Sequence, residues 1–222
     1  RLLPGHCLDL EAGRVHRFWP STGIETCADT DAVVEETIDL VRRQFEALLS
    51  GDRRLGLALT AGHETRFLRA CARPYLDRMD FVTVVGGDRH ATDTVIARRI
   101  ACKFGLNQIE LRRTTATAEQ RRAFIRRGGH CYADSNSRFH PSVWPIARSH
   151  VFAGGLGGEY GRAFLWREKD RSETQITARL LNNRLGLPED PVVLASLERW
   201  LKDLDTDNAL SILDLAYNEN RM

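Results

Sequence analysis

The sequence lacks the patterns that would assign it at once to several classes of protein. No apolar run approaches the roughly 18 residues of a transmembrane helix, so we expect no membrane partner. The five cysteines show no Cys-x-x-Cys spacing, which argues against a zinc site or a disulfide framework and favours reduced thiols in the cytoplasm. The net charge is only +2 over 222 residues, so we expect no nucleic acid to be held by bulk charge. The arginine pairs at 112–113, 121–122 and 126–127 are taken as solvated helix faces and loop ends.

Two common nucleotide-binding fingerprints are also absent. The segment Thr60-Ala61-Gly62-His63-Glu64-Thr65-Arg66 is small and polar, but no Gly-Lys-Ser/Thr follows, so it is not a Walker A loop. The glycine-rich segment 155–161 carries Tyr160 where a dinucleotide fingerprint needs its last glycine. A Rossmann dehydrogenase is therefore disfavoured.

The sequence does contain a regular alternation of short apolar runs and amphipathic stretches. We predict strands at 55–59, 81–85, 108–111 and 149–153. We predict helices from an N-cap at Asp31 to Gly51, and at about 64–76, 92–104, 118–127, 173–184, 190–204 and 208–220. This order predicts an α/β fold: a parallel sheet of about five strands with helices on both faces, an N-terminal β-hairpin at 6–19 and a helical C-terminal portion.

The turn after the first of these strands, residues 60–65, has the features of an anion site. Gly62 lets the backbone approach a ligand, Thr60 and Thr65 supply hydroxyl groups, and the N–H groups at a helix start favour negative charge. Glu64 can hold a magnesium ion that bridges phosphates. A tight turn in which Thr60 or Thr65 only caps the helix explains the same residues.

The succession of segments resembles the asparagine synthetase family, which belongs to the ATP-pyrophosphatase (PP-loop) group of adenine nucleotide α-hydrolase-like folds. Residues 60–65 look like its Ser-Gly-Gly-x-Asp-Ser pyrophosphate loop, and 155–161 resembles its Gly-x-Gly-(small)-Asp-Glu motif. Residues 84–87 and 93–106 are similar to the second strand of that family and to the helix that follows it. Residues 2–19 resemble its interdomain segment, and residues 210–222 resemble one of its C-terminal helices. The likeness covers most of the 222 residues in order.

The resemblance implies roles for individual residues. Those implied to bind ATP are Leu59, Thr60, Ala61, Gly62, His63, Glu64, Thr65, Val85, Gly86, Gly155, Gly157 and Gly158. Glu64 and Glu159 would hold Mg²⁺. Arg66 is a candidate for contacting a phosphate or the substrate, or else a surface arginine, and Lys169 is a candidate for the family's catalytic lysine.

The implied reaction is adenylation of a small-molecule carboxylate substrate. The carboxylate attacks the α-phosphorus of ATP, pyrophosphate leaves, and an amine captures the acyl-adenylate, so the chain would be an ATP-dependent amide-forming ligase. The polar residues Asp134, Ser135, Asn136 and Arg138 can read the substrate or form an Asx-type turn system.

Departures from the family pattern keep other interpretations open. Ala61 adds a Cβ where the backbone approaches phosphate, and Glu64 is one methylene longer than the family's aspartate, to which Mg²⁺ geometry is sensitive. The alternative is a noncatalytic nucleotide-binding or protein-interaction module that keeps the fold. A third interpretation is an unrelated phosphate-binding α/β protein.

The ends of the sequence suggest a piece of a longer protein, since it starts on Arg1 and its last helical pattern stops abruptly. We expect residues 1–30 to be a linker and hairpin that follow a missing domain, and the resemblance implies that this domain is an N-terminal glutaminase. Residues 31–222 would form the PP-loop domain. The sequence predicts no oligomeric state.

Overall fold

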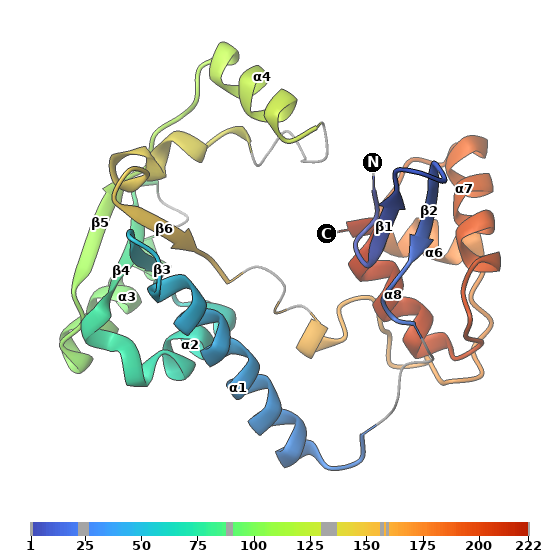
Figure 1. Cartoon of the computed structure of the whole chain (residues 1–222), viewed down its shortest axis with the longest axis horizontal. Coiled ribbons are helices and arrows are strands. Elements are labelled where there is room, and N and C mark those ends of the chain that lie inside the picture. The colour runs from blue at the N-terminus through green and yellow to red at the C-terminus, as the bar shows by residue number, and fades with distance from the viewer. Residues whose placement is uncertain are drawn as a thin grey trace. The chain divides into compact units, whose positions relative to one another are not determined.

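The computed structural model describes residues 2–21, 27–87, 91–129, 137–155, 158 and 160–221. The chain divides into two compact units (Figure 1). The sheet unit comprises residues 27–156, and the helical unit comprises residues 1–26 together with 157–222. The N-terminal hairpin therefore belongs to the same unit as the C-terminal helices.

The sheet unit is built on four parallel strands, β3 (Arg54–Ala58), β4 (Met79–Val85), β5 (Gln108–Arg112) and β6 (His150–Ala153). Their order is β5-β4-β3-β6, and every neighbouring pair is parallel. This confirms the predicted α/β fold, with four strands in the described part of the chain. The order reverses at β3, because β4 and β5 lie on one side of it and β6 on the other. Ligands of such sheets bind at the carboxyl ends of the strands beside this reversal.

Helices cover both faces of the sheet. Leu55, Leu57 and Phe81 are fully buried on one face, where they pack with α1 (Thr30–Leu49), α2 (His63–Cys71) and α3 (Ala91–Phe104). Val82, the next residue along β4, faces the other way and packs with Ile146 of the 3-10 helix η3 (His140–Ile146). This alternation is the two-residue period of a strand that is buried on both faces.

Two predicted helix boundaries in the sheet unit need correction. The N-cap of α1 is Asp29, whose carboxylate accepts hydrogen bonds from the N–H groups of Asp31 and Ala32, so Asp31 lies in the first turn. The predicted helix 64–76 ends at Cys71 and continues as the 3-10 helix η1 (Arg73–Arg78), because Pro74 cannot donate the next helical hydrogen bond. The helix α4 (Ala118–Arg127) agrees with its prediction and begins with a capping box.

The described part of the helical unit contains an antiparallel hairpin, β1 (His6–Asp9) and β2 (Arg14–Arg17). It also contains the α-helices α6 (Ala178–Leu185), α7 (Pro191–Lys202) and α8 (Ala209–Arg221). The helix predicted from residue 173 begins only at Ala178, because the Thr177 hydroxyl caps it there. Glu219 of α8 is fully buried and accepts a hydrogen bond of 2.6 Å from the indole of Trp200. Its other oxygen pairs with Arg17, which attaches the hairpin to the helices.

Candidate functional site

The predicted anion turn lies at the carboxyl end of β3 and leads into α2. The Thr60 and Thr65 hydroxyl groups are 2.9 Å apart, and the Thr60 hydroxyl accepts the N–H of Gly62 at 3.0 Å. The Thr65 hydroxyl donates to the Gly62 carbonyl at 3.2 Å, and Thr65 is buried. The two hydroxyl groups therefore hold the turn closed on itself.

The start of α2 has no side-chain cap. Its N-cap is Gly62, which makes no side-chain hydrogen bond, and His63 in its first turn is exposed. The first N–H groups of a helix have no partner within the helix, so this end attracts an anion. The N–H of Ala61, just before it, donates to the Asp93 carboxylate at 3.0 Å.

Asp93 was missed as a site residue by the sequence prediction. It lies in the first turn of α3, the helix that follows the neighbouring strand β4. An acidic residue at that point of the next βα unit is the signal that could have found it, because parallel neighbours end at the same edge of the sheet.

The second glycine turn meets the first one at the reversal of strand order. Gly155 follows β6, and a Cβ atom on it would lie 2.8 Å from the Glu64 Cβ and 3.1 Å from the Thr65 backbone nitrogen. Only glycine fits at such a distance from backbone. The structure thus brings Gly155 against the turn at residues 60–65.

Glu64 lies in this junction of the two turns. Its Oε1 atom is buried, and its Oε2 atom is 3.4 Å from the position that a Cβ on Gly62 would take. No group of three or more metal-ligating side chains occurs among the described residues. Because Mg²⁺ is commonly bound by one or two carboxylates together with substrate phosphates, a single carboxylate beside the turn fits the ion. Glu159 and Gly157 lie outside the described residues.

The residues implied to hold adenine lie at the carboxyl ends of β3 and β4. Leu59 is fully buried, its N–H donates to the Val82 carbonyl, and its own carbonyl accepts the Thr83 hydroxyl at 2.9 Å. The Val85 carbonyl accepts the N–H of Arg113 at 2.8 Å. Gly86 follows with a φ of 114°, which turns the chain away from the strand. The main-chain N–H and carbonyl of Leu59 therefore make hydrogen bonds to β4, whereas Gly86 is exposed to solvent.

Three further candidates are divided between the two units. Arg66 is exposed in the first turn of α2, and its Nε atom donates to the Gly62 carbonyl at 3.3 Å. Lys169 and Gly158 belong to the helical unit, where Lys169 is exposed. Asp134, Ser135 and Asn136 lie outside the described residues.

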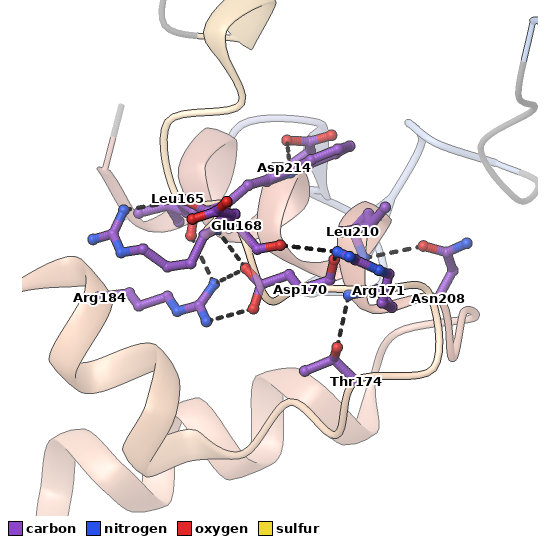
Figure 2. A network of polar contacts seen from close by, with 11 residues as sticks. Leu165, Glu168, Asp170, Arg171, Thr174, Arg184, Asn208, Leu210 and Asp214 are labelled. Carbon is purple, nitrogen blue, oxygen red and sulfur yellow. Dashed lines mark hydrogen bonds and ion pairs between the residues drawn. The ribbon is translucent and has the colours of Figure 1, made fainter.

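The helical unit also holds a network of polar contacts that includes Asp170 and Arg184 (Figure 2). Asp170 is buried and receives both guanidinium arms of Arg184, at 2.5 and 2.8 Å. These hydrogen bonds lower the pKa of Asp170 from its ordinary value. Asp214 accepts the indole N–H of Trp166 at 2.9 Å, and burial raises its pKa. The network fixes the segment that precedes α6.

The opposite edge of the sheet carries a second charge cluster that the sequence prediction missed. Asp80, at the amino end of β4, is buried and bound by Arg54 through two hydrogen bonds of 2.7 and 3.1 Å. His150 Nε2 lies 2.7 Å from the same carboxylate, and the Asn107 amide donates to it. Burial alone would raise the pKa of Asp80, but the hydrogen bonds from Arg54, His150 and Asn107 outweigh it and lower the pKa to about 2.

No protein-family model matches this chain, and no curated protein matches its sequence. Within the described residues, every helix is too short or too polar to cross a membrane.

Proposed function

We propose that the chain is an ATP-dependent amide-forming ligase of the asparagine synthetase type, which acts through an acyl-adenylate. The observation that carries this proposal is the meeting of the two turns. Gly155 is packed against Glu64 and Thr65, at the reversal of strand order where parallel sheets bind ligands.

Phosphate groups would bind at the start of α2. Gly62 leaves that helix end without a side-chain cap, so its N–H groups are directed at a ligand. Glu64 would hold Mg²⁺, which when bound neutralises part of the phosphate charge. Arg66 lies in the same helical turn and offers its remaining guanidinium donors to a phosphate or to the substrate carboxylate.

In the proposed reaction, a carboxylate oxygen of the acid attacks the α-phosphorus of ATP, and the bond to pyrophosphate breaks. An amine then attacks the acyl carbon, and AMP leaves with the bonding electrons. The described residues bind and orient the phosphates and balance their charge, which are the largest contributions to such reactions. The amine is ammonia, from a glutaminase domain in a longer chain or from solution, or another amine.

The four cysteines among the described residues, Cys7, Cys27, Cys71 and Cys102, are free. Free thiols are typical of reducing compartments, which supports a cytoplasmic location for this activity.

One observation favours the noncatalytic module as a second candidate. The N–H of Ala61 is bound by Asp93, and the N–H of Gly62 is bound by the Thr60 hydroxyl. The turn thus satisfies two of its own donors, which a phosphate would otherwise use. A noncatalytic descendant would retain this arrangement without binding ATP.

Calorimetric titration with ATP and Mg²⁺ separates the two candidates. For the ligase we expect magnesium-dependent binding that Glu64→Gln weakens at least tenfold and that Glu64→Asp retains, because only the carboxylate can hold the ion. Glu119→Gln is the matched control, since Glu119 is also an acid in the first turn of a helix but lies in α4. No heat at millimolar ATP and Mg²⁺ contradicts the ligase proposal.

A further inference from the structure

His150, at the start of β6, links a surface hydroxyl group to the buried carboxylate of Asp80. The Ser149 hydroxyl lies 2.8 Å from His150 Nδ1, and His150 Nε2 lies 2.7 Å from the Asp80 carboxylate. The three side chains thus form a continuous series from an alcohol through an imidazole to a carboxylate. Enzymes that transfer acyl groups place a nucleophile, a base and a group that orients the base in this order.

The ionisation of Asp80 determines which nitrogen of His150 carries the proton. The pKa of Asp80 is lowered to about 2, so at neutral pH its carboxylate can only accept hydrogen bonds. His150 Nε2 therefore donates to it, which leaves Nδ1 of the neutral imidazole as an acceptor. The Ser149 hydroxyl in turn donates to Nδ1. This is the tautomer that a general base for Ser149 requires.

The fold fixes the imidazole of His150 behind the hydroxyl group. The His150 side chain is only 9% exposed, and its Cδ2 atom lies 3.5 Å from the position that a Cβ on Gly56 would take, so the ring packs beside the neighbouring strand β3. The Asp80 carboxylate is held by two hydrogen bonds from Arg54 and one from Asn107. The base and the group that orients it are therefore in place before any substrate arrives.

Ser149 itself is open to solvent. It is exposed in the turn between η3 and β6, and its carbonyl accepts the N–H of Arg54 at 3.0 Å, which attaches its main chain to the sheet. Its hydroxyl also lies 3.3 Å from the Ile146 carbonyl, a longer contact than the one to the imidazole. A hydroxyl group has one proton to donate, and the shorter contact directs it to His150. A substrate can thus reach the oxygen while the base stays buried.

We propose that Ser149 is the nucleophile of a second site, at the amino ends of the strands, which hydrolyses small carboxylic esters. Ser149 Oγ attacks the carbonyl carbon while its proton passes to His150 Nδ1, and the bond to the alcohol breaks as the alcohol takes up that proton. Water then attacks the acyl-serine and gives its proton to His150, which returns it to Ser149 as the acid leaves. Asp80 stabilises the imidazolium that forms in each step.

The exposure of Ser149 determines which esters react. A nucleophile on the surface gains little from substrate binding, so the reactivity of the ester must supply what binding does not. Aryl esters, whose leaving group is a stable phenolate, are therefore the expected substrates and provide the probe. None of the residues involved belongs to the turns at 60–65 and 155–161, so this site does not depend on the ligase proposal.

Labelling with a fluorophosphonate tests the nucleophile directly, because an activated serine oxygen attacks its phosphorus and fluoride leaves. In the whole 222-residue chain, we expect peptide mass spectrometry to find Ser149 labelled at least about a hundredfold faster than Ser50, since a general base contributes about 10²–10⁴-fold. Ser50 is the matched reference, because it is also exposed but its hydroxyl donates to the Ala47 carbonyl at 2.8 Å instead of to an imidazole. Equal labelling of the two serines, or no label on Ser149, overturns the proposal.

Hydrolysis of p-nitrophenyl acetate measures turnover. Ser149→Ala removes only the hydroxyl group of an exposed residue, so it should keep the fold and lower kcat/KM at least about a hundredfold. Ser50→Ala should leave the rate unchanged. Turnover that persists in Ser149→Ala comes from another group and contradicts the assignment. The assay contains neither ATP nor Mg²⁺, so its result holds whether or not the chain is a ligase.

His150→Ala tests the base with a measurement that stability alone does not affect. The variant should lose the labelling of Ser149, and added imidazole should restore part of it, because the free base can enter the space that the ring vacates. Labelling that survives His150→Ala unchanged overturns the proposed role of His150. A loss that imidazole does not restore assigns His150 to the fold alone and overturns that role as well.

Discussion

The amino ends and the carboxyl ends of the parallel strands form two edges of the sheet, and charged groups are bound differently at each. At the amino edge, the buried carboxylate of Asp80 is bound by Arg54, His150 and Asn107. At the carboxyl edge, the start of α2 has no side-chain cap and the Arg113 guanidinium rests on an aromatic ring. At the first edge the buried charge is bound by its neighbours and serves stability, whereas the second edge is where we propose that ATP binds. Substitutions at the two edges should therefore separate stability from ATP binding.

The largest effect on stability is expected at the amino edge. Asp80→Ala removes the acceptor of Arg54 and His150 and leaves the His150 side chain buried beside an unpaired arginine. We expect the free energy of unfolding, measured with urea, to fall by about 3 kcal/mol. Asp77→Ala, at an exposed acid of η1, should change it by less than about 0.5 kcal/mol. ATP affinity, measured well below the unfolding transition, should not change. A loss of affinity there would break the division between the edges.

Gly155→Ala tests the carboxyl edge, where a substitution should weaken ATP binding as well as stability. The new methyl group would meet the Glu64 side chain and the Thr65 backbone, so we expect up to about 3 kcal/mol of destabilisation together with weaker ATP binding. Gly154→Ala is the natural control, because a Cβ atom on Gly154 has no neighbour within 4 Å. Equal behaviour of the two variants in calorimetry and urea unfolding would contradict the close approach of the two turns.

The pH dependence of the free energy of unfolding should depend on Asp80 at the amino edge. The pKa of Asp80 is lowered from 3.8 to about 2 in the folded protein, so the folded state favours the ionised carboxylate. The resulting stabilisation, about 2 kcal/mol, is present above pH 4 and is lost as the pH falls from about 4 to about 2. Asp80→Asn should flatten the unfolding free energy in this window. An unchanged acid slope in the variant would assign the slope to other carboxylates.

The smallest expected effect concerns Asp93. Asp93→Ala removes the hydrogen bond to the Ala61 N–H and should cost about 1 kcal/mol in thermal unfolding. Asp93→Asn keeps an acceptor oxygen at this position and should restore most of that stability. If the asparagine variant behaves like the alanine variant, the negative charge of Asp93, and not its hydrogen bond, holds the turn.

Local sequence patterns were sufficient to predict the strands of the sheet and the turn at residues 60–65. Buried runs such as the one at Leu55 and Leu57 are apolar on both faces, and Gly62 follows directly, so both features are visible within ten residues. Helix ends were less predictable where two residues compete, as Asp29 and Asp31 do for the cap of α1. Pro74 was the visible signal for the early end of α2.

The rest of the candidate site depends on strand order, which a single sequence does not contain. Gly155 reaches Glu64 because β6 pairs with β3, although their sequence positions are far apart. Arg113 and Phe139 meet because residues after β5 are hydrogen-bonded to Arg138 and to Ser142 of η3. The interpretation of Arg112-Arg113 as a solvated pair treated the two alike, and only the fold distinguishes them.

The pairing of Arg17 with Glu219 has a consequence for how the protein is made. These residues are 202 positions apart, and the whole sheet unit lies between them in the chain. During synthesis the hairpin emerges before the sheet unit, whereas its buried carboxylate partner emerges after the sheet unit. The sheet unit can thus complete its folding on the ribosome before α8, which carries the partner of Arg17, has been synthesised. The helical unit, with contacts of such long range, is expected to be the slow step of maturation.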